Sequence, residues 1–309
     1  MTLVLLGLGL WLVSLPRWLS PLGRRLQPSE RVRFSVIGLV LGALVTEVAL
    51  VMLAVPTALS AFGINALAAA CRRALGDLAP GGLQIGWSAA ALAVLLPLLA
   101  WRGCVRARAA SHETRVEPGL GTHHLFEEAE LVQLPTDAVL AYSLDGPRPQ
   151  IVVSDGLVAL LSGDELDLLV RHELAHIHGH HGLVLRILAA VDAAVPAGRW
   201  VTQPVRVALE RCADEVAARG APDRRAALLD ALLRVAASEP PVGVAAFTSR
   251  SSVLERAHAL LAEPPAPTRT QRAGARVALF GSTATAAVAV GAWTFEAHMM
   301  LSMAGICRM

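Results

Sequence analysis

Residues 170–179 of this chain read Val170-Arg-His-Glu-Leu-Ala-His-Ile-His-Gly179. Within this stretch, His172, Glu173 and His176 form the pattern H-E-x-x-H. On a helix, the two histidines lie one turn apart on the same face and can bind one metal ion together. Glu173 then lies beside that ion, where it can act as general base for a water molecule. A polar helix face rich in histidine would give the same pattern, so the surrounding sequence has to decide.

The composition of the chain predicts a membrane protein. Of its 309 residues, 54% are hydrophobic and only 17% are charged, and the mean hydropathy is +0.53. Soluble domains carry more charge, so membrane-spanning helices are expected. The net charge of +2 gives no indication of direct nucleic-acid binding. The four cysteines are scattered without a C-x-x-C pair, so neither a disulfide framework nor a thiolate metal site is expected.

Four apolar segments are predicted to span the membrane, at about residues 2–22, 34–55, 83–101 and 277–295. Arginine clusters lie at residues 17–33, 102–108 and 269–276. Because basic residues concentrate on the cytoplasmic side, four spans place all three clusters in the cytoplasm. Arg72 and Arg73 then lie on the outer side, against this rule. Glu47 falls within the second span and is interpreted as either a functional carboxylate or an interfacial one.

This topology divides the chain into three parts. Residues 1–101 hold three spans, residues 102–275 form a cytoplasmic domain that contains the H-E-x-x-H stretch, and residues 276–309 hold the fourth span and a short external tail. The oligomeric state is left open. All basic side chains other than histidine are arginine and none is lysine, which indicates a GC-rich genome.

The predicted cytoplasmic part, residues 102–275, has the sequence pattern of an α+β domain. Three short runs are predicted as strands: residues 129–134, 138–144 and 150–154. Ser162-Gly-Asp-Glu165 then predicts a capping box that opens the helix with the H-E-x-x-H pattern. Further helices are predicted over residues 183–195, packed in the domain or at the membrane surface, and over residues 202–219. The histidines at 112, 123 and 124 are interpreted as solvated residues of a polar loop.

A zinc peptidase needs three protein ligands and an open position for water. His180 lies on the same helical face, but a straight helix carries it a further turn away from His172. The longer pattern H-E-x-x-H-x-x-G-x-x-H fails because residue 182 is glycine. Glu210 and Asp214, four residues apart on a later helix, offer a third ligand and a carboxylate that accepts the free ring N–H of a ligand histidine. The alternative is a solvated acidic helix face.

H-E-x-x-H followed by E-x-x-A-D at 210–214 resembles the signature of two groups of membrane-embedded gluzincin peptidases. One group holds heat-shock and prenyl-protein endopeptidases, and the other holds BlaR/MecR-type antirepressor peptidases of bacterial β-lactam signalling. The second is more similar in its four spans, its cytoplasmic domain before the fourth span, and a proline fourteen residues before Glu210. The resemblance implies an α-helical membrane protein with an inserted α+β zincin-like (gluzincin) domain. It makes His172, His176 and Glu210 zinc ligands, Glu173 the base and Asp214 the orienting carboxylate.

The same resemblance implies a bacterial, multi-pass membrane zinc endopeptidase whose substrate is a winged-helix repressor or the chain itself. Its substrate would lie along an edge strand at Leu140, Ala141 and Tyr142. The hydroxyl of Tyr142 would bind the oxyanion or, as the preferred interpretation, have a structural role. β-Lactam sensors continue after the fourth span into an external penicillin-binding domain, which we expect this chain to lack. The alternatives are a quality-control protease of the first group and a non-catalytic zinc-binding signalling protein.

Overall fold

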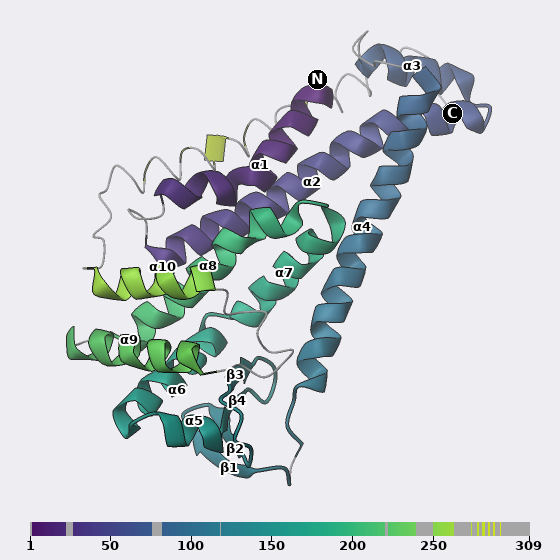
Figure 1. Ribbon diagram of the computed structural model, residues 1–309. Coiled ribbons are helices and arrows are strands. Elements are labelled where there is room, and N and C mark those ends of the chain that lie inside the picture. Colours follow the sequence, from purple (N-terminus) through teal and green to yellow (C-terminus); the bar gives the residue numbers. More distant parts are fainter. Residues whose placement is uncertain are drawn as a thin grey trace.

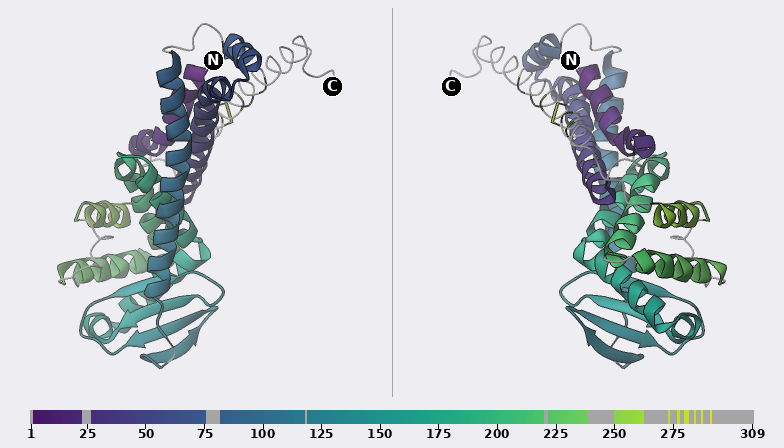
Figure 2. Two further views of the ribbon diagram at one scale, coloured as in Figure 1. Left: turned by 90° about the vertical axis from the view of Figure 1, so that its right-hand side faces the viewer. Right: turned by 90° about the vertical axis from the view of Figure 1, so that its left-hand side faces the viewer.

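The computed structural model describes residues 2–22, 27–75, 82–117, 119–219, 222–238 and 250–262, with isolated positions between 273 and 291. The chain begins with four helices: α1 (Thr2–Leu22), α2 (Pro28–Ala61), α3 (Asn65–Leu75) and α4 (Gly82–Glu113). Long helices form one end of the molecule and a small sheet forms the other, with shorter helices between them (Figures 1 and 2). Helix α4 runs from the N-terminal end of the molecule down to the sheet.

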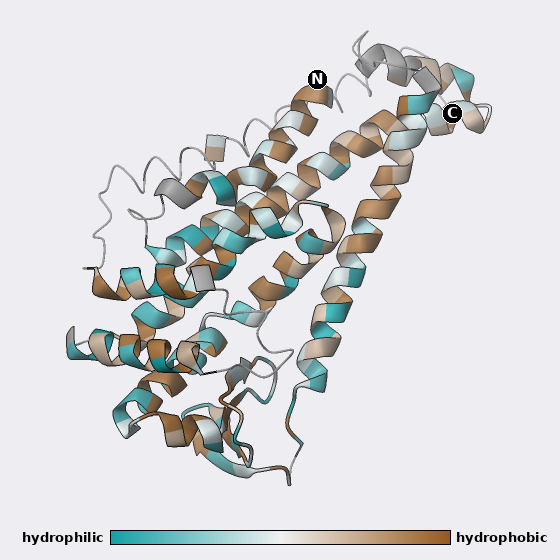
Figure 3. Cartoon of the chain, viewed as in Figure 1, coloured by the Kyte–Doolittle hydropathy of each residue, from teal (hydrophilic) through white to brown (hydrophobic). Residues whose placement is uncertain are grey.

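Three of the described helices are long and apolar enough to cross a membrane, by length and composition: Thr2–Leu19, Pro28–Ala61 and Gln84–Glu113. They correspond to the first three predicted spans. Helix α2 extends beyond the predicted residues 34–55 at both ends. Its arginine-containing first turn is helical, and the helix continues past Pro56 to Ala61. Figure 3 shows α4 apolar along its upper part and hydrophilic toward the sheet. The predicted fourth span, residues 277–295, lies outside the described residues except for isolated positions.

Helices α1 and α2 cross at small residues. A Cβ placed on Gly42 would lie 2.7 Å from the Val13 backbone nitrogen and 2.8 Å from the Gly9 carbonyl oxygen. One turn earlier on α2, a Cβ on Gly38 would lie 2.8 Å from a methyl carbon of Leu15. Two glycines four residues apart therefore let the helix backbones approach closely, which is how helices without a hydrophobic driving force associate in lipid.

Helix α4 continues past its predicted end at residue 101 as far as Glu113. Its C-terminal half packs against α7 (His181–Ala194). At this contact a Cβ on Gly103 would lie 2.5 Å from the Ala189 carbonyl oxygen, so glycine is required for the close approach. The predicted domain boundary between residues 101 and 102 therefore falls inside a continuous helix.

The sheet has four strands: β1 (Thr122–Phe126), β2 (Ala129–Leu134), β3 (Ala141–Leu144) and β4 (Gln150–Ser154). Their order is β1-β2-β4-β3, with β2 and β4 parallel and both edge strands antiparallel to their neighbours. The runs 129–134 and 150–154 are confirmed as strands, and the run 138–144 is a strand only in its second half. The predicted polar loop is wrong: His112 lies in α4, and His123 and His124 lie in β1.

Within the described residues, six helices follow the sheet: α5 (Asp155–Leu160), α6 (Gly163–His178), α7, α8 (Gly198–Ala217), α9 (Pro222–Ala237) and α10 (Arg250–Leu261). Helix α6 begins with the predicted capping box, in which the Ser162 hydroxyl accepts from the Glu165 backbone and the Glu165 carboxylate accepts from the Ser162 backbone. Its apolar stripe (Val170, Leu174, Ile177) packs with Ile151 and Val153 of β4. This packing fixes the rotation of α6.

Candidate metal centre

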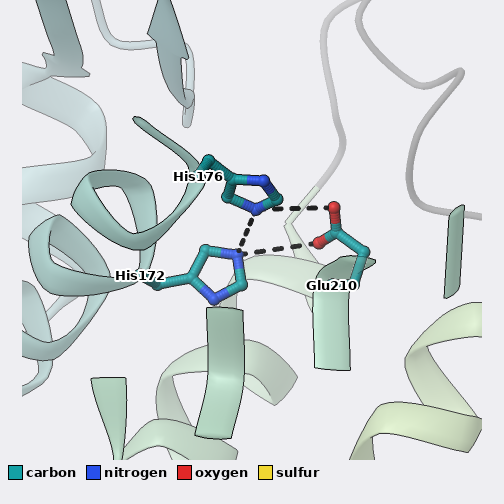
Figure 4. A group of neighbouring side chains, drawn as sticks. All are labelled: His172, His176 and Glu210. Atoms are coloured by element: carbon teal, nitrogen blue, oxygen red, sulfur yellow. Dashed lines mark hydrogen bonds and ion pairs between the residues drawn. The ribbon is translucent and has the colours of Figure 1, made fainter. Parts of the chain in front are cut away.

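Helices α6 and α8 bring the two histidines of the H-E-x-x-H pattern together with Glu210. The Nε2 atoms of His172 and His176 are 3.2 Å apart, and each lies 3.6 Å from one Glu210 carboxylate oxygen. Figure 4 shows the two rings and the carboxylate converging on one point. One donor atom from each residue lies within 4.8 Å of the other two. The structure thus assembles the three residues that the sequence predicts as zinc ligands.

The position of the carboxylate follows from the amphipathic character of α8. Val205, Ala208, Leu209 and Ala213 are all buried, which holds this helix against its neighbours. Glu210 and Asp214, four residues apart, then share the face that points at α6. Asp214 is 2% exposed and its Oδ1 lies 3.0 Å from Nδ1 of His172. The acidic pair is therefore part of the centre rather than a solvated helix face.

Arg256 of α10 joins both acidic residues, and no sequence pattern indicated it. Its Nε and Nη2 donate to the two Asp214 oxygens at 2.8 and 2.7 Å, and its Nη1 lies 3.0 Å from Glu210 Oε2. Arg256 is 6% exposed, so this arrangement is buried. It neutralises part of the negative charge that α8 brings toward the histidines.

The charges of the centre set opposite protonation states on the two histidines. Burial lowers the pKa of His172, but the Asp214 and Glu210 carboxylates outweigh it and raise the pKa to about 9. For His176, burial dominates and lowers the pKa to about 4. Burial alone would raise the pKa of Glu210, whereas both histidines and Arg256 lower it well below its usual range. The metal-free centre therefore holds a charged His172 beside a neutral His176.

His181 contacts the second ring nitrogen of His176. The two Nδ1 atoms are 2.8 Å apart and the rings meet edge to face, with centroids 4.7 Å apart. Gly179 makes room for this ring, because a Cβ there would lie 2.4 Å from Nε2 of His181. His180 between them has φ 50°, a left-handed conformation that costs a non-glycine residue free energy. In the pattern H-E-x-x-H-x-x-G-x-x-H the last histidine would be residue 182, one position after His181, so the pattern predicts no role for His181.

The Glu173 carboxylate lies between the centre and the sheet. The Ser143 hydroxyl of β3 donates to its Oε2 at 2.8 Å. Burial raises the pKa of Glu173 above its usual range, while His172 and Ser143 work against this shift. A carboxylate with a raised pKa is suited to accepting and returning a proton near neutral pH. Ser143 had no predicted role, although the alternation along β3 places it on the face toward α6.

Strand β3 is at the edge of the sheet, where a peptide could add as a further strand. Ala141 and Tyr142 lie in β3, and Leu140 precedes it. Tyr142 lies on the face away from α6, packed near Val132 and Val152, and its hydroxyl donates to the Thr114 carbonyl at 2.9 Å. This contact gives Tyr142 a structural role and directs its hydroxyl away from the metal centre.

The donor set fits a zinc ion. Two imidazole nitrogens and one carboxylate form the ligand combination of gluzincin-type catalytic sites, which leave a fourth position open. The carboxylate of Asp214 behind His172 is a support that ligand histidines usually have, and the ring of His181 takes the corresponding place behind His176. His172, His176 and Glu210 would hold the ion.

Comparison with known proteins identifies a metallopeptidase domain in this region. Residues 124–198 match the family model of Peptidase family M48. The match runs from β1 to the first residue of α8 and contains the H-E-x-x-H helix; Glu210, Asp214 and Arg256 lie beyond it. It covers less than half of the chain, and it does not single out the BlaR/MecR type. No curated protein and no solved structure matches the chain.

Proposed function

We propose that the chain is a membrane-bound zinc-dependent endopeptidase with Glu173 as general base. The observation that carries the proposal is the convergence of His172, His176 and Glu210, with the Glu173 carboxylate beside them and held by a residue of the edge strand. A purely structural zinc site needs no base. The match to a metallopeptidase family supports the same chemistry.

Each residue near the candidate metal site has its own proposed role in peptide hydrolysis. A zinc ion held by the three ligands supplies a Lewis acid that activates water and polarises the scissile carbonyl. Glu173 takes the proton of the attacking water on its carboxylate and passes it to the leaving amine. The Ser143 hydroxyl holds the carboxylate in place through Oε2. The Asp214 carboxylate, 3.0 Å from Nδ1 of His172, favours the tautomer with its proton on Nδ1, which leaves Nε2 free to bind the metal.

We infer that a peptide substrate lies extended along β3, with Leu140, Ala141 and Tyr142 contributing backbone contacts. This strand has an open edge and carries the residue that contacts Glu173. A cytoplasmic repressor of winged-helix type, or the chain itself, is the proposed substrate. The catalytic domain would face the cytoplasm, with α1, α2 and α4 in the bacterial cell membrane, because the arginine clusters flank these helices.

A paired expression experiment tests the enzyme. Wild type and Glu173→Gln are produced in the same membranes with a candidate repressor, and fragments and bound zinc are measured. We expect fragments only with the wild type and about one zinc per chain in both. Loss of zinc in His172→Ala, with zinc kept in His124→Ala, is the control for the ligand set. Identical fragments from wild type and Glu173→Gln would refute the proposal.

A second function is quality-control proteolysis in the membrane. The M48 match favours a peptidase without favouring the antirepressor type, so the substrate class stays a proposal. Cleavage of misfolded membrane proteins, with the repressor left intact, would assign the chain to this second function.

A further inference from the structure

A cavity of about 390 Å³ lies apart from the metal centre, where α1 and α2 meet α8 and α10. It is lined by Arg17, Arg31, Arg199, Trp200, Gln203, Pro204, Val207, Ser252 and Glu255. Three of these residues are arginines from three different helices, against a single carboxylate. The metal centre uses none of these residues, so its chemistry does not explain the concentration of positive charge.

Arg31 is the residue that points to a ligand. It is 5% exposed, and its Nε has no hydrogen-bond partner among the described residues. The charged groups that act on it are Glu255, which is attractive, and Arg211, which is repulsive. A buried N–H without an acceptor costs free energy, because it loses its water without a replacement. An anion in the cavity would supply the acceptor that Nε of Arg31 lacks.

The surroundings of the cavity match the interface of a membrane. The guanidinium of Arg17 lies over the Trp200 ring, 5.0 Å from its centroid. Trp200 is 56% exposed, and on α1 the side chains of Trp11 and Trp18 are exposed along one face. Tryptophans of this kind gather at the level of lipid headgroups. Trp200, Pro204 and Val207 give the cavity an apolar wall beside its arginines.

We propose that this cavity binds the phosphate headgroup of an anionic phospholipid at the cytoplasmic face of the membrane. Arginine is suited to phosphate because its planar fork donates two parallel hydrogen bonds, and basic pockets between spanning helices recognise lipid headgroups in this way. The bound lipid joins α1 and α2 to α8 and α10, which also carry Glu210 and Arg256 of the centre. The proposal rests on the membrane location within the proposed function and is independent of catalysis.

The test is lipid binding to the full chain in detergent, measured by native mass spectrometry. Dioctanoyl phosphatidylglycerol is titrated against dioctanoyl phosphatidylcholine and inorganic phosphate. We expect wild type to prefer phosphatidylglycerol by about tenfold and Arg31→Gln to lose about that factor, as for one charge-assisted contact. Arg106→Gln removes an exposed arginine of α4 outside the cavity and is expected to bind like wild type.

Three results would overturn the proposal: equal losses in Arg31→Gln and Arg106→Gln, equal binding of the two lipids, and binding of inorganic phosphate without lipid. The thermal midpoint in lipid-free detergent separates a ligand-binding Arg31 from a structural one. We expect Arg31→Gln to match or exceed wild type there, because it removes a buried charge whose Nε has no hydrogen-bond partner among the described residues. If this variant does not fold, Arg199→Gln, which changes an exposed cavity residue, carries the same expected loss of lipid preference.

Discussion

Replacing Arg256 by glutamine tests whether the buried ion pair organises the metal centre. The guanidinium makes contacts of 2.7 and 2.8 Å to Asp214 and 3.0 Å to Glu210, and both Arg256 and Asp214 are buried. Its removal leaves two carboxylates in the interior with His172 as their remaining cation. Removing one partner of a buried ion pair costs about 3–5 kcal/mol. For a chain of this size such a loss lowers the thermal midpoint by roughly 10 °C.

The assay is thermal unfolding of the metal-free chain in detergent. Arg234→Gln is the matched control, because Arg234 is an exposed side chain whose Nε lies 3.4 Å from Glu165. Its loss is expected to cost less than about 1 kcal/mol. Adding Asp214→Asn to Arg256→Gln leaves one carboxylate instead of two beside His172 and should recover part of the stability. If Arg256→Gln unfolds no earlier than Arg234→Gln, the buried ion pair does not organise this site.

Three further outcomes are expected. His181→Phe lowers zinc affinity by about 10–100-fold, because His176 loses its Nδ1 partner. His181→Asn keeps an acceptor and restores most of the affinity. Zinc affinity is measured by competition with a chelator, and equal affinities of wild type and His181→Phe would contradict this role. Without metal, the stability of the chain falls as pH rises from 6.5 to about 9. The pKa of His172 is raised to about 9 in the folded chain, so the stabilisation from protonated His172 is complete below pH 6.5 and lost above pH 9. His172→Gln should flatten this part of the curve of thermal midpoint against pH, and an unchanged slope would contradict the role of His172. Gly103→Val unfolds at lower temperature than wild type, since its side chain meets the Ala189 carbonyl.

The candidate residues of the centre and much of its local structure can be predicted from the sequence alone. The proposed ligand histidines, the proposed base and the capping box of α6 depend on spacing within one or two helical turns, which sequence periodicity records directly. The first three apolar helices are also predictable from the sequence, because length and composition define a candidate membrane span. Glu210 and Asp214 were predictable as a pair because their four-residue spacing puts them on one helix face.

The distant groups that support the centre become visible only in the folded chain. Arg256 comes from α10, and nothing in its neighbours indicates that its guanidinium closes on Asp214. His181 lies close in sequence, but the left-handed backbone at His180 is needed to turn its ring onto His176. Ser143 acquires its role through the position of β3 beside α6. These contacts form when separate elements pack together, so they depend on the burial and the direction of each side chain. Neither the burial nor the direction is encoded in the local sequence pattern.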